Sequence, residues 1–356
     1  MKRVIQILIF ASIFTLIYLG MNYFVLSGIF GLLNIAKSGI FYVSLFLLSG
    51  SFIVASVIEH NTPNKITRYF YILSSTLLGA VFISLSVLIV YYIINIFIHI
   101  QAFIVIGLIL VLTIYSIINA ENIVTRKIKV EIQGLKKPMR AVQLTDIHLG
   151  TVHSSPFLKK IVEKTNSLKP DVVFITGDLV DGSAPLTSDI VSPINKIKAK
   201  TFFTIGNHEI YDGIDEVMNL LKTTKLDILR NKVAKFKELQ IIGVDYSDDK
   251  EYLGKILPNM EIKKNKPSIL LYHPPSDLKF SNMFGIQLQL AGHTHAGQIF
   301  PFNLLVRTSF KYVRGFHKEG KSSIYVSQGT GTWGPAMRLG SKSEITVIEL
   351  VPEKLR

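Results

Sequence analysis

A run of 50 residues, Tyr69–Ile118, contains no Asp, Glu, Lys or Arg. A helix that crosses a membrane needs about 20 mostly apolar residues, so this run is too long for one span and predicts two helices joined by a tight turn. We place the turn near Asn95–Gln101, where three polar residues interrupt the run. Two earlier apolar runs predict two more spans, from Val4 to about Tyr23 and from Ser38 to Ile58.

Charge divides the chain into a membrane part and a soluble part. The chain has 39 Lys and Arg residues and 25 Asp and Glu residues, of which residues 1–120 hold only five and one. The mean hydropathy of +0.38 is high for a soluble enzyme of this length. We therefore predict a membrane domain over residues 1–120 with four spans, a basic linker over 121–139 and a soluble domain over 140–356.

The first apolar run has a second interpretation. Lys2 and Arg3 before it also fit the start of a cleaved signal peptide. The run lacks a small-x-small cleavage pattern, however, and three further spans follow, which favours an uncleaved anchor. Polar residues inside the spans fit either a transport path or contacts between helices. Because no Asp, Glu, Lys or Arg lies in mid-span, we favour helix packing.

Basic residues are unevenly shared between the two sides that four spans define. On one side, ten Lys and Arg residues lie before span one, between spans two and three or after span four. Only Lys37 lies on the other side. Short loops rich in Lys and Arg stay in the cytoplasm. The sequence thus predicts that both termini and the soluble domain are cytoplasmic.

The soluble domain shows alternating strand and helix patterns followed by a run of strands, which indicates a layered α/β fold. Polar clusters follow five of the predicted strands. They contain five of the nine His residues and are Asp146-Ile147-His148, Gly177-Asp178, Gly206-Asn207-His208-Glu209, His273-Pro274-Pro275 and Gly292-His293-Thr294-His295. Ligand sites in open α/β sheets lie at the carboxyl ends of strands, so we expect the clusters to converge.

The composition of these clusters predicts a metal site. If the backbone is extended, the two residues of Asp146-x-His148 point the same way, as do those of His293-x-His295, and each pair can hold one ion. The chain has no Cys, which excludes thiolate sites and disulfides. Ligands of the Asp, Asn and His types suit Mn²⁺, Fe²⁺ or Zn²⁺ better than Ca²⁺.

The five clusters, in this order and spacing, resemble the full signature of the calcineurin-like metallophosphoesterase superfamily over Arg140–Val351. The extensions around Gly292–Gln298 and Tyr325–Gly331 resemble the bacterial branch with membrane-tethered phosphodiesterases, including UDP-diacylglucosamine hydrolases, although Ala296 stands where that branch often has Gly. The resemblance implies an α/β fold, a four-layer α-β-β-α sandwich, here preceded by a four-helix transmembrane domain.

The same resemblance implies two divalent metal ions, with Mn²⁺ expected first and Fe²⁺ or Zn²⁺ as alternatives. The first ion would be held by Asp146, His148, Asp178 and His295. The second would be held by Asp178, Asn207, His273 and His293. His208 would be the catalytic residue that donates a hydrogen bond or proton to the phosphate or leaving group, and Glu209 would orient it.

Basic residues after the last cluster are candidates for a further role. Arg307, Lys311 and Arg314 could meet a second phosphate or an anionic head group, or they could be solvated surface charges. Residues 121–356 hold 34 basic and 24 acidic residues, a net charge of +10. That charge fits either nucleic acid or an anionic membrane leaflet. Because no nucleic-acid fold motif is visible, we expect membrane lipids as partners and no nucleic acid.

These features predict a membrane-anchored, dinuclear metal-dependent phosphohydrolase of a bacterial inner or plasma membrane. It would cleave a phosphodiester or pyrophosphate bond by attack of a metal-bridged hydroxide. Since the anchor confines the site to a membrane surface, we expect a lipid-linked substrate such as a UDP-acylated sugar. The alternatives are a phosphodiesterase acting on soluble nucleotides and a non-enzymatic membrane sensor. The sequence predicts no oligomeric state.

Overall fold

The computed structural model describes residues 2–276 and 278–353 and divides the chain into two compact units. The helical unit comprises Met1–Ile118 together with Gly334–Leu339, and the sheet unit comprises Asn119–Trp333 together with Gly340–Arg356. The first boundary lies close to the predicted end of the membrane domain at residue 120. The place of Gly334–Leu339 in the helical unit was not predicted.

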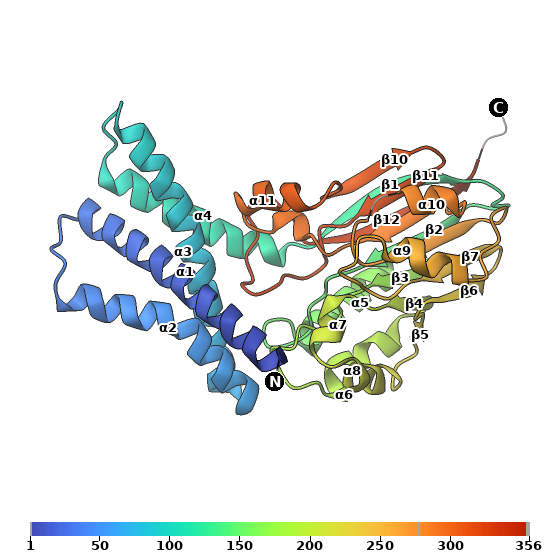
Figure 1. The fold of residues 1–356 in the computed structure, drawn as a ribbon, viewed down its shortest axis with the longest axis horizontal. Coiled ribbons are helices and arrows are strands. Elements are labelled where there is room, and N and C mark those ends of the chain that lie inside the picture. The colour runs from blue at the N-terminus through green and yellow to red at the C-terminus, as the bar shows by residue number, and fades with distance from the viewer. Residues whose placement is uncertain (1, 277, 354–356) are drawn as a thin grey trace. The chain divides into compact units, whose positions relative to one another are not determined.

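The helical unit contains the four predicted apolar helices, each long and apolar enough to cross a membrane (Figure 1). They are α1 (Lys2–Leu32), α2 (Gly39–Asn61), α3 (Lys65–Asn95) and α4 (Ala102–Glu121). α1 continues beyond the predicted end near Tyr23 because the chain stays uncharged until Lys37. α3 and α4 meet at the predicted turn, where the backbone N–H of Ile100 donates to Asn95 Oδ1 at 3.0 Å.

Several polar side chains in these helices donate hydrogen bonds to carbonyl oxygens of their own helix. Asn22 donates to the carbonyl oxygen of Tyr18 at 2.8 Å, and Ser84 donates to that of Ala80 at 2.7 Å. Such bonds to the preceding turn satisfy a polar group without a partner outside the helix. Helix packing as the role of these residues stays a prediction.

The sheet unit contains two mixed six-stranded sheets. The first has the order β1 (Val124–Ile132), β12 (Glu344–Pro352), β2 (Met139–Leu144), β3 (Val172–Thr176), β4 (Lys200–Thr204) and β5 (Asp227–Ile228). The second has the order β10 (Gly315–Glu319), β11 (Ser322–Val326), β9 (Leu288–Ala291), β8 (Ser268–Leu271), β7 (Leu239–Gly243) and β6 (Lys232–Phe236). β2, β3 and β4 run parallel, as do β7, β8 and β9, so each set has its carboxyl ends at one edge.

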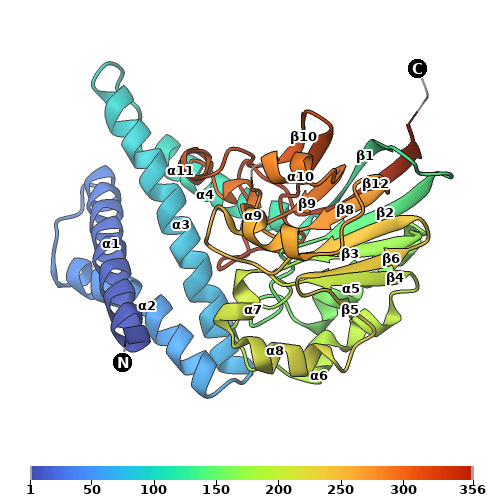
Figure 2. The same ribbon diagram turned by 45° about the vertical axis from the view of Figure 1, so that its right-hand side comes forward.

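Helices cover the outer faces of both sheets, which confirms the predicted four-layer α-β-β-α sandwich (Figures 1 and 2). Strand alternation produces the layers. In β3, Val172 and Phe174 belong to the core between the sheets, whereas Val173 and Ile175 belong to the core under the first helical layer.

The helices of this unit are short. The first sheet carries α5 (Ser155–Ser167), α6 (Ser188–Val191) and α8 (Ile214–Leu221), and the second carries α9 (Tyr252–Ile256) and α10 (Lys279–Met283). The remaining helices are α7 (Asn207–Tyr211), α11 (Phe302–Ser309) and 3₁₀ turns at Ser192–Lys196, Leu257–Asn259 and His295–Gly297.

Residues 121–139 are not the simple linker that we predicted. Val124–Ile132 forms β1, which pairs in parallel with β12 along its whole length, and Val130 and Ile132 are buried between the sheets. The exposed positions of β1 carry Arg, Lys and Glu. These charged residues alternate with the apolar ones, so the segment has no continuous apolar run that would predict a strand. Only Asn122 and Ile123 separate the end of α4 from the start of β1.

Candidate metal centre

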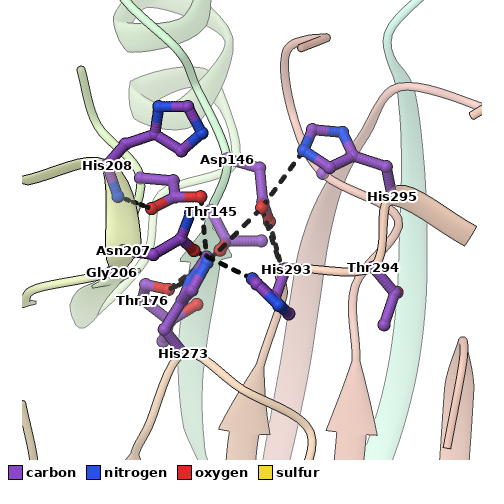
Figure 3. Close-up of polar contacts among 12 residues, drawn as sticks. Thr145, Asp146, Thr176, Gly206, Asn207, His208, His273, His293, Thr294 and His295 are labelled. Carbon is purple, nitrogen blue, oxygen red and sulfur yellow. Dashed lines mark hydrogen bonds and ion pairs between the residues drawn. The ribbon is translucent and has the colours of Figure 1, made fainter. Parts of the chain in front are cut away.

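The five predicted clusters follow β2, β3, β4, β8 and β9 and converge at the carboxyl ends of these strands (Figure 3). Contacts link all seven predicted ligands, which are Asp146, His148, Asp178, Asn207, His273, His293 and His295. The structure thus brings the seven predicted residues together, and their role as metal ligands stays a prediction.

Asp146 joins the clusters after β2 and β9. Its Oδ1 accepts a hydrogen bond from the backbone N–H of His293 at 3.0 Å and lies 3.3 Å from His295 Nε2. His295 Nε2 also lies 3.0 Å from His148 Nε2. A Cβ at Gly292 would come within 2.2 Å of Asp146 Oδ2, so only glycine allows this approach.

Asp178 joins the clusters after β3 and β8. Its Oδ2 lies 3.0 Å from His273 Nε2 and 3.8 Å from His148 Nε2. His273 Nδ1 donates to the carbonyl oxygen of Thr176 at 2.7 Å, which leaves Nε2 to face the carboxylate. A metal-binding His usually donates its other ring N–H in this way. Gly206 permits the close approach of β4, since a Cβ there would lie 2.2 Å from Asp178 Oδ1.

The start of α7 adds Asn207 and His208. Asn207 Oδ1 lies 2.9 Å from His293 Nδ1. The backbone N–H of His208 donates to Asp178 Oδ1 at 3.0 Å, and its ring meets that of His148 edge-on at 4.7 Å between centroids.

Three groups of side chains have ligand atoms close enough to share one ion. They are Asp146-His148-His295, Asp178-His273-His293 and His148-Asp178-His208. The first two match the predicted division into two ions. The third shows that position alone does not separate His208 from the ligands.

Glu209 has a different role from the one we expected. Instead of contacting the His208 ring, its buried carboxylate accepts hydrogen bonds of 2.6–3.3 Å from the backbone N–H groups of Asp178, Leu179, Val180 and Gly206. Burial raises the pKa of this carboxyl. Glu209 therefore fixes the loop that carries Asp178 against the loop that carries Asn207.

The ligand pairs are not extended, contrary to our expectation. Asp146, His148, His293 and His295 have φ values of 50°, 53°, 73° and 48°, and Asp178 has 52°. Residues other than glycine rarely adopt this left-handed region, and each such residue costs about 1–3 kcal/mol unless its surroundings hold it. The side chains thus converge through tight turns rather than through the pleat of a strand, a form of strain that clusters at functional sites.

The buried charges favour a bound cation. Although burial opposes ionisation, His273 holds the pKa of Asp178 well below its usual range, and His295 does the same for Asp146. Burial lowers the pKa of His273, but Asp178 outweighs it and raises that pKa to about 10, so without a metal a proton on His273 offsets the carboxylate, and a bound cation would take the place of this proton. Burial, reinforced by His273, lowers the pKa of His293 to about 4 and so keeps this ring in the neutral form that binds metals.

The donor set fits divalent ions. It consists of carboxylate and amide oxygens and imidazole nitrogens, which suit Mn²⁺, Fe²⁺ or Zn²⁺. The Nε2 atoms of His148 and His295 face each other at 3.0 Å, an arrangement that either a shared hydrogen or a cation bound by both nitrogens satisfies. Two ionised carboxylates lie in the same buried place, so a cation is the more favourable occupant.

Aromatic residues lie around the ligands, and two of them, Tyr246 and Phe310, were not predicted from the sequence. Tyr246 and Phe310 lie 5.7 and 5.3 Å from the His293 ring, and Trp333 lies 6.3 Å from the His208 ring, measured between centroids. Tyr246 follows β7 at the edge where the clusters gather, so strand position could have predicted it. Phe310 follows α11 and has no comparable local signal.

The predicted basic residues lie after the ligands along the chain. Arg307 is exposed on α11, and Arg314 donates to the carbonyl oxygen of Gly340 at 3.3 Å. Lys311 pairs with Glu319 at 2.7 Å. None of these contacts involves a metal ligand, so a substrate role for the three bases stays a prediction.

Comparison with known proteins places this centre in a family. Residues 139–297 match the family model described as calcineurin-like phosphoesterase. The chain is 38% identical over 259 residues to a metallophosphoesterase of Campylobacter jejuni, a match that covers 68% of each protein. It is 33% identical over 267 residues to a transmembrane protein with metallophosphoesterase domain from Danio rerio, covering 67% of this chain and 60% of that protein.

The chain therefore belongs to the calcineurin-like metallophosphoesterases, hydrolases that act on phosphate esters. The four apolar helices and the transmembrane relative indicate integration in a membrane. Among solved structures, a dimetal phosphatase from Danio rerio aligns with 10% identity and a TM-score of 0.35, over 54% of this chain and 87% of that one. The predicted family and enzyme class are confirmed, whereas the narrower resemblance to UDP-diacylglucosamine hydrolases stays a prediction.

Proposed function

We propose that this chain is a membrane-anchored dinuclear phosphohydrolase that cleaves a phosphodiester or pyrophosphate bond in a lipid-linked substrate, such as a UDP-acylated sugar. The observation that carries the proposal is the convergence of seven Asp, Asn and His side chains in a chain with four apolar helices. The two-residue connection between α4 and β1 supports the choice of substrate. Such a tether keeps the site near a membrane and raises the effective concentration of a substrate that resides there.

We assign Asp146, His148, Asp178 and His295 to one ion, and Asp178, Asn207, His273 and His293 to the other. The grouping of ligand atoms supports this division. Asp178 is the proposed bridge because its Oδ2 faces both His273 and His148. When bound, Mn²⁺ or a similar ion would supply Lewis-acid activation of water and would offset charge on the phosphoryl group.

The other residues position and protonate the substrate. His208 Nδ1 lies 3.4 Å from the carbonyl oxygen of Asp181, which can only accept, so Nδ1 carries a hydrogen. When the ring is protonated, Nε2 also carries a hydrogen and can donate this hydrogen to the leaving oxygen, as a general acid does. Glu209 fixes the position of Asp178 relative to the start of α7 for this step.

Turnover of competing substrates tests the proposal. Purified full-length protein with Mn²⁺ would receive lipid-linked diphosphates in detergent, nucleotide diesters and an aryl phosphodiester, and a membrane lipid extract would be searched for released products. We expect the lipid-linked substrate to have a kcat/KM at least about tenfold above the nucleotides, because remote binding energy raises turnover. Faster hydrolysis of soluble nucleotides would support the alternative phosphodiesterase function instead.

A further inference from the structure

The first half of α11 exposes large apolar side chains to solvent. It has no buried residue, and Phe302, Leu304 and Leu305 are 45%, 52% and 62% exposed. Phe300, just before the helix, is 50% exposed. Isolated exposed apolar residues are ordinary, but a surface helix normally turns its apolar residues towards a core. Four such residues within one short segment form a patch of the kind that marks an interaction site.

Both ends of α11 are fixed to the metal centre. Next to its first turn, a Cβ at Gly297 would come 2.3 Å from the Cα of Asn303, so the loop that carries His295 packs tightly on the helix. At its other end, the ring of Phe310 meets that of His293 at 5.3 Å between centroids. The apolar face therefore has a defined position relative to the ligands.

Trp333 lies beside the same segment. Its backbone N–H donates to Gln298 Oε1, and its carbonyl oxygen accepts from Gln298 Nε2, both at 2.9 Å. Gln298 lies two residues before Phe300 in the chain. The side chain is 58% exposed. Tryptophan is enriched where an apolar membrane interior meets water, because its ring is apolar and its N–H is polar.

Charge in this segment is entirely basic. Residues 300–314 include Arg307, Lys311 and Arg314 and contain no Asp or Glu. Lys311 pairs with Glu319, whereas Arg307 and Arg314 are exposed to solvent. Basic residues beside an exposed apolar face are typical of helices that lie in the interface of a membrane with anionic lipids.

We propose that Phe300–Ser309 and Trp333 form a lipid-contact surface that lies in the interface of a bilayer, with Arg307 and Arg314 meeting anionic head groups. The occupant is a bilayer because the chain carries four apolar spans, and only two residues separate the last of them from β1. The surface needs no catalysis, so the proposal is independent of the proposed substrate.

Tryptophan fluorescence tests this directly, because Trp333 is the only tryptophan in the chain. Full-length protein would be placed in nanodiscs of phosphatidylcholine and phosphatidylglycerol, with and without bromine on the acyl chains. Brominated lipids quench only nearby tryptophans. We expect clear quenching of Trp333, and weaker quenching when phosphatidylglycerol is left out or when Arg307→Gln and Arg314→Gln are combined.

Two matched variants separate this surface from the rest of the unit. In a Trp333→Phe background, Leu305→Trp places the probe on α11 and Met283→Trp places it on α10, at positions that are 62% and 63% exposed. We expect at least twofold stronger quenching for Leu305→Trp than for Met283→Trp. Equal quenching of the two would overturn the proposal. So would protection of Leu305→Trp from brominated lipid together with a cross-linked dimer, which would assign the surface to a second copy.

Discussion

Glu209 shows how one buried carboxylate orders the loops around a metal centre. Its oxygens accept hydrogen bonds from backbone N–H groups in the loop after β3 and in the turn before α7. Hydrogen bonds to a charged group contribute about 1.5–3 kcal/mol each, and the loss of the acceptor would leave buried donors unpaired. The position of Asp178 therefore depends on a residue that touches neither the substrate nor, in our assignment, a metal.

Substitutions of His208 and Asp178 should separate turnover from metal binding. His208→Ala should keep both metals and lower turnover by about 10²–10⁴-fold, as for the loss of a positioned acid. Asp178→Asn should lose metal and activity together, because it weakens the ligand proposed for both ions. Metal analysis and rates on both variants decide the matter. Loss of a metal in His208→Ala would assign His208 to the ligands, as the His148-Asp178-His208 group allows.

Asp212 should make stability depend on pH. Burial, together with the nearby carboxylate of Asp181, raises the pKa of Asp212 to about 7. An unfolded Asp ionises near pH ~4. Between these values the folded protein holds a proton that the unfolded chain has released, so the unfavourable effect of this group on folding decreases as the pH falls from about 7 to about 4.

Asp212→Asn removes this titration. We expect the variant to melt at a higher temperature than the wild type near pH ~8, where the wild-type carboxylate carries an unfavourable buried charge. Below pH ~4 the group is protonated in both the folded and the unfolded wild type, and the two proteins should melt alike. Melting curves across this range check the expectation. A difference that does not change with pH would show that Asp212 is not responsible.

Contacts between residues that are far apart in the sequence could not be predicted from it. The seven proposed ligands were predicted because they lie in clusters after buried strands and because these clusters resemble the metallophosphoesterase signature. The four donors to Glu209 were not, since three of them come from a loop about 30 residues earlier. The left-handed φ values of the Asp-x-His and His-x-His pairs were also missed, because an alternating pattern does not distinguish a strand from a tight turn.

At the scale of elements, burial decided which strands the sequence could predict. β3, β4, β8 and β9 are almost entirely buried strands in the interior of the sheets, and all were predicted. β1, β6 and β10 were missed. They lie at sheet edges and mix Lys, Glu or His with apolar residues, and edge strands are often charged to prevent further pairing. β1 also depends on β12, whose residues lie more than 200 positions later.

The burial of β1 leads to a test. Ile132→Ala should lower the free energy of unfolding of the sheet unit by about 2–5 kcal/mol, because it leaves a cavity between the sheets. Lys129→Ala, at an exposed position of the same strand, should change it by about 0.5 kcal/mol or less. Denaturant unfolding in detergent, followed through Trp333, measures both. If the segment were a linker, both variants would change the free energy of unfolding by similarly small amounts.

At the scale of the whole molecule, the proposed orientation follows from charge. Six of the ten bases counted on the cytoplasmic side come after α4, and three of those lie on β1 rather than in a free loop. The four bases at the starts of α1 and α3 still outnumber Lys37, so a cytoplasmic sheet unit remains our prediction. A green fluorescent protein fused to the C-terminus should be bright and an alkaline phosphatase fusion inactive. The reverse result would place the sheet unit outside the cytoplasm.

Metal dependence is the most direct test of the dinuclear hydrolase. Full-length protein would be supplied with Mn²⁺, assayed on an aryl phosphodiester and analysed for bound metal, then stripped with a chelator and measured again. We predict about two ions per chain, loss of hydrolysis when they are removed and recovery when Mn²⁺ returns, since oxygen and nitrogen ligands hold such ions exchangeably. Hydrolysis that continues at full rate in metal-free protein would contradict the account.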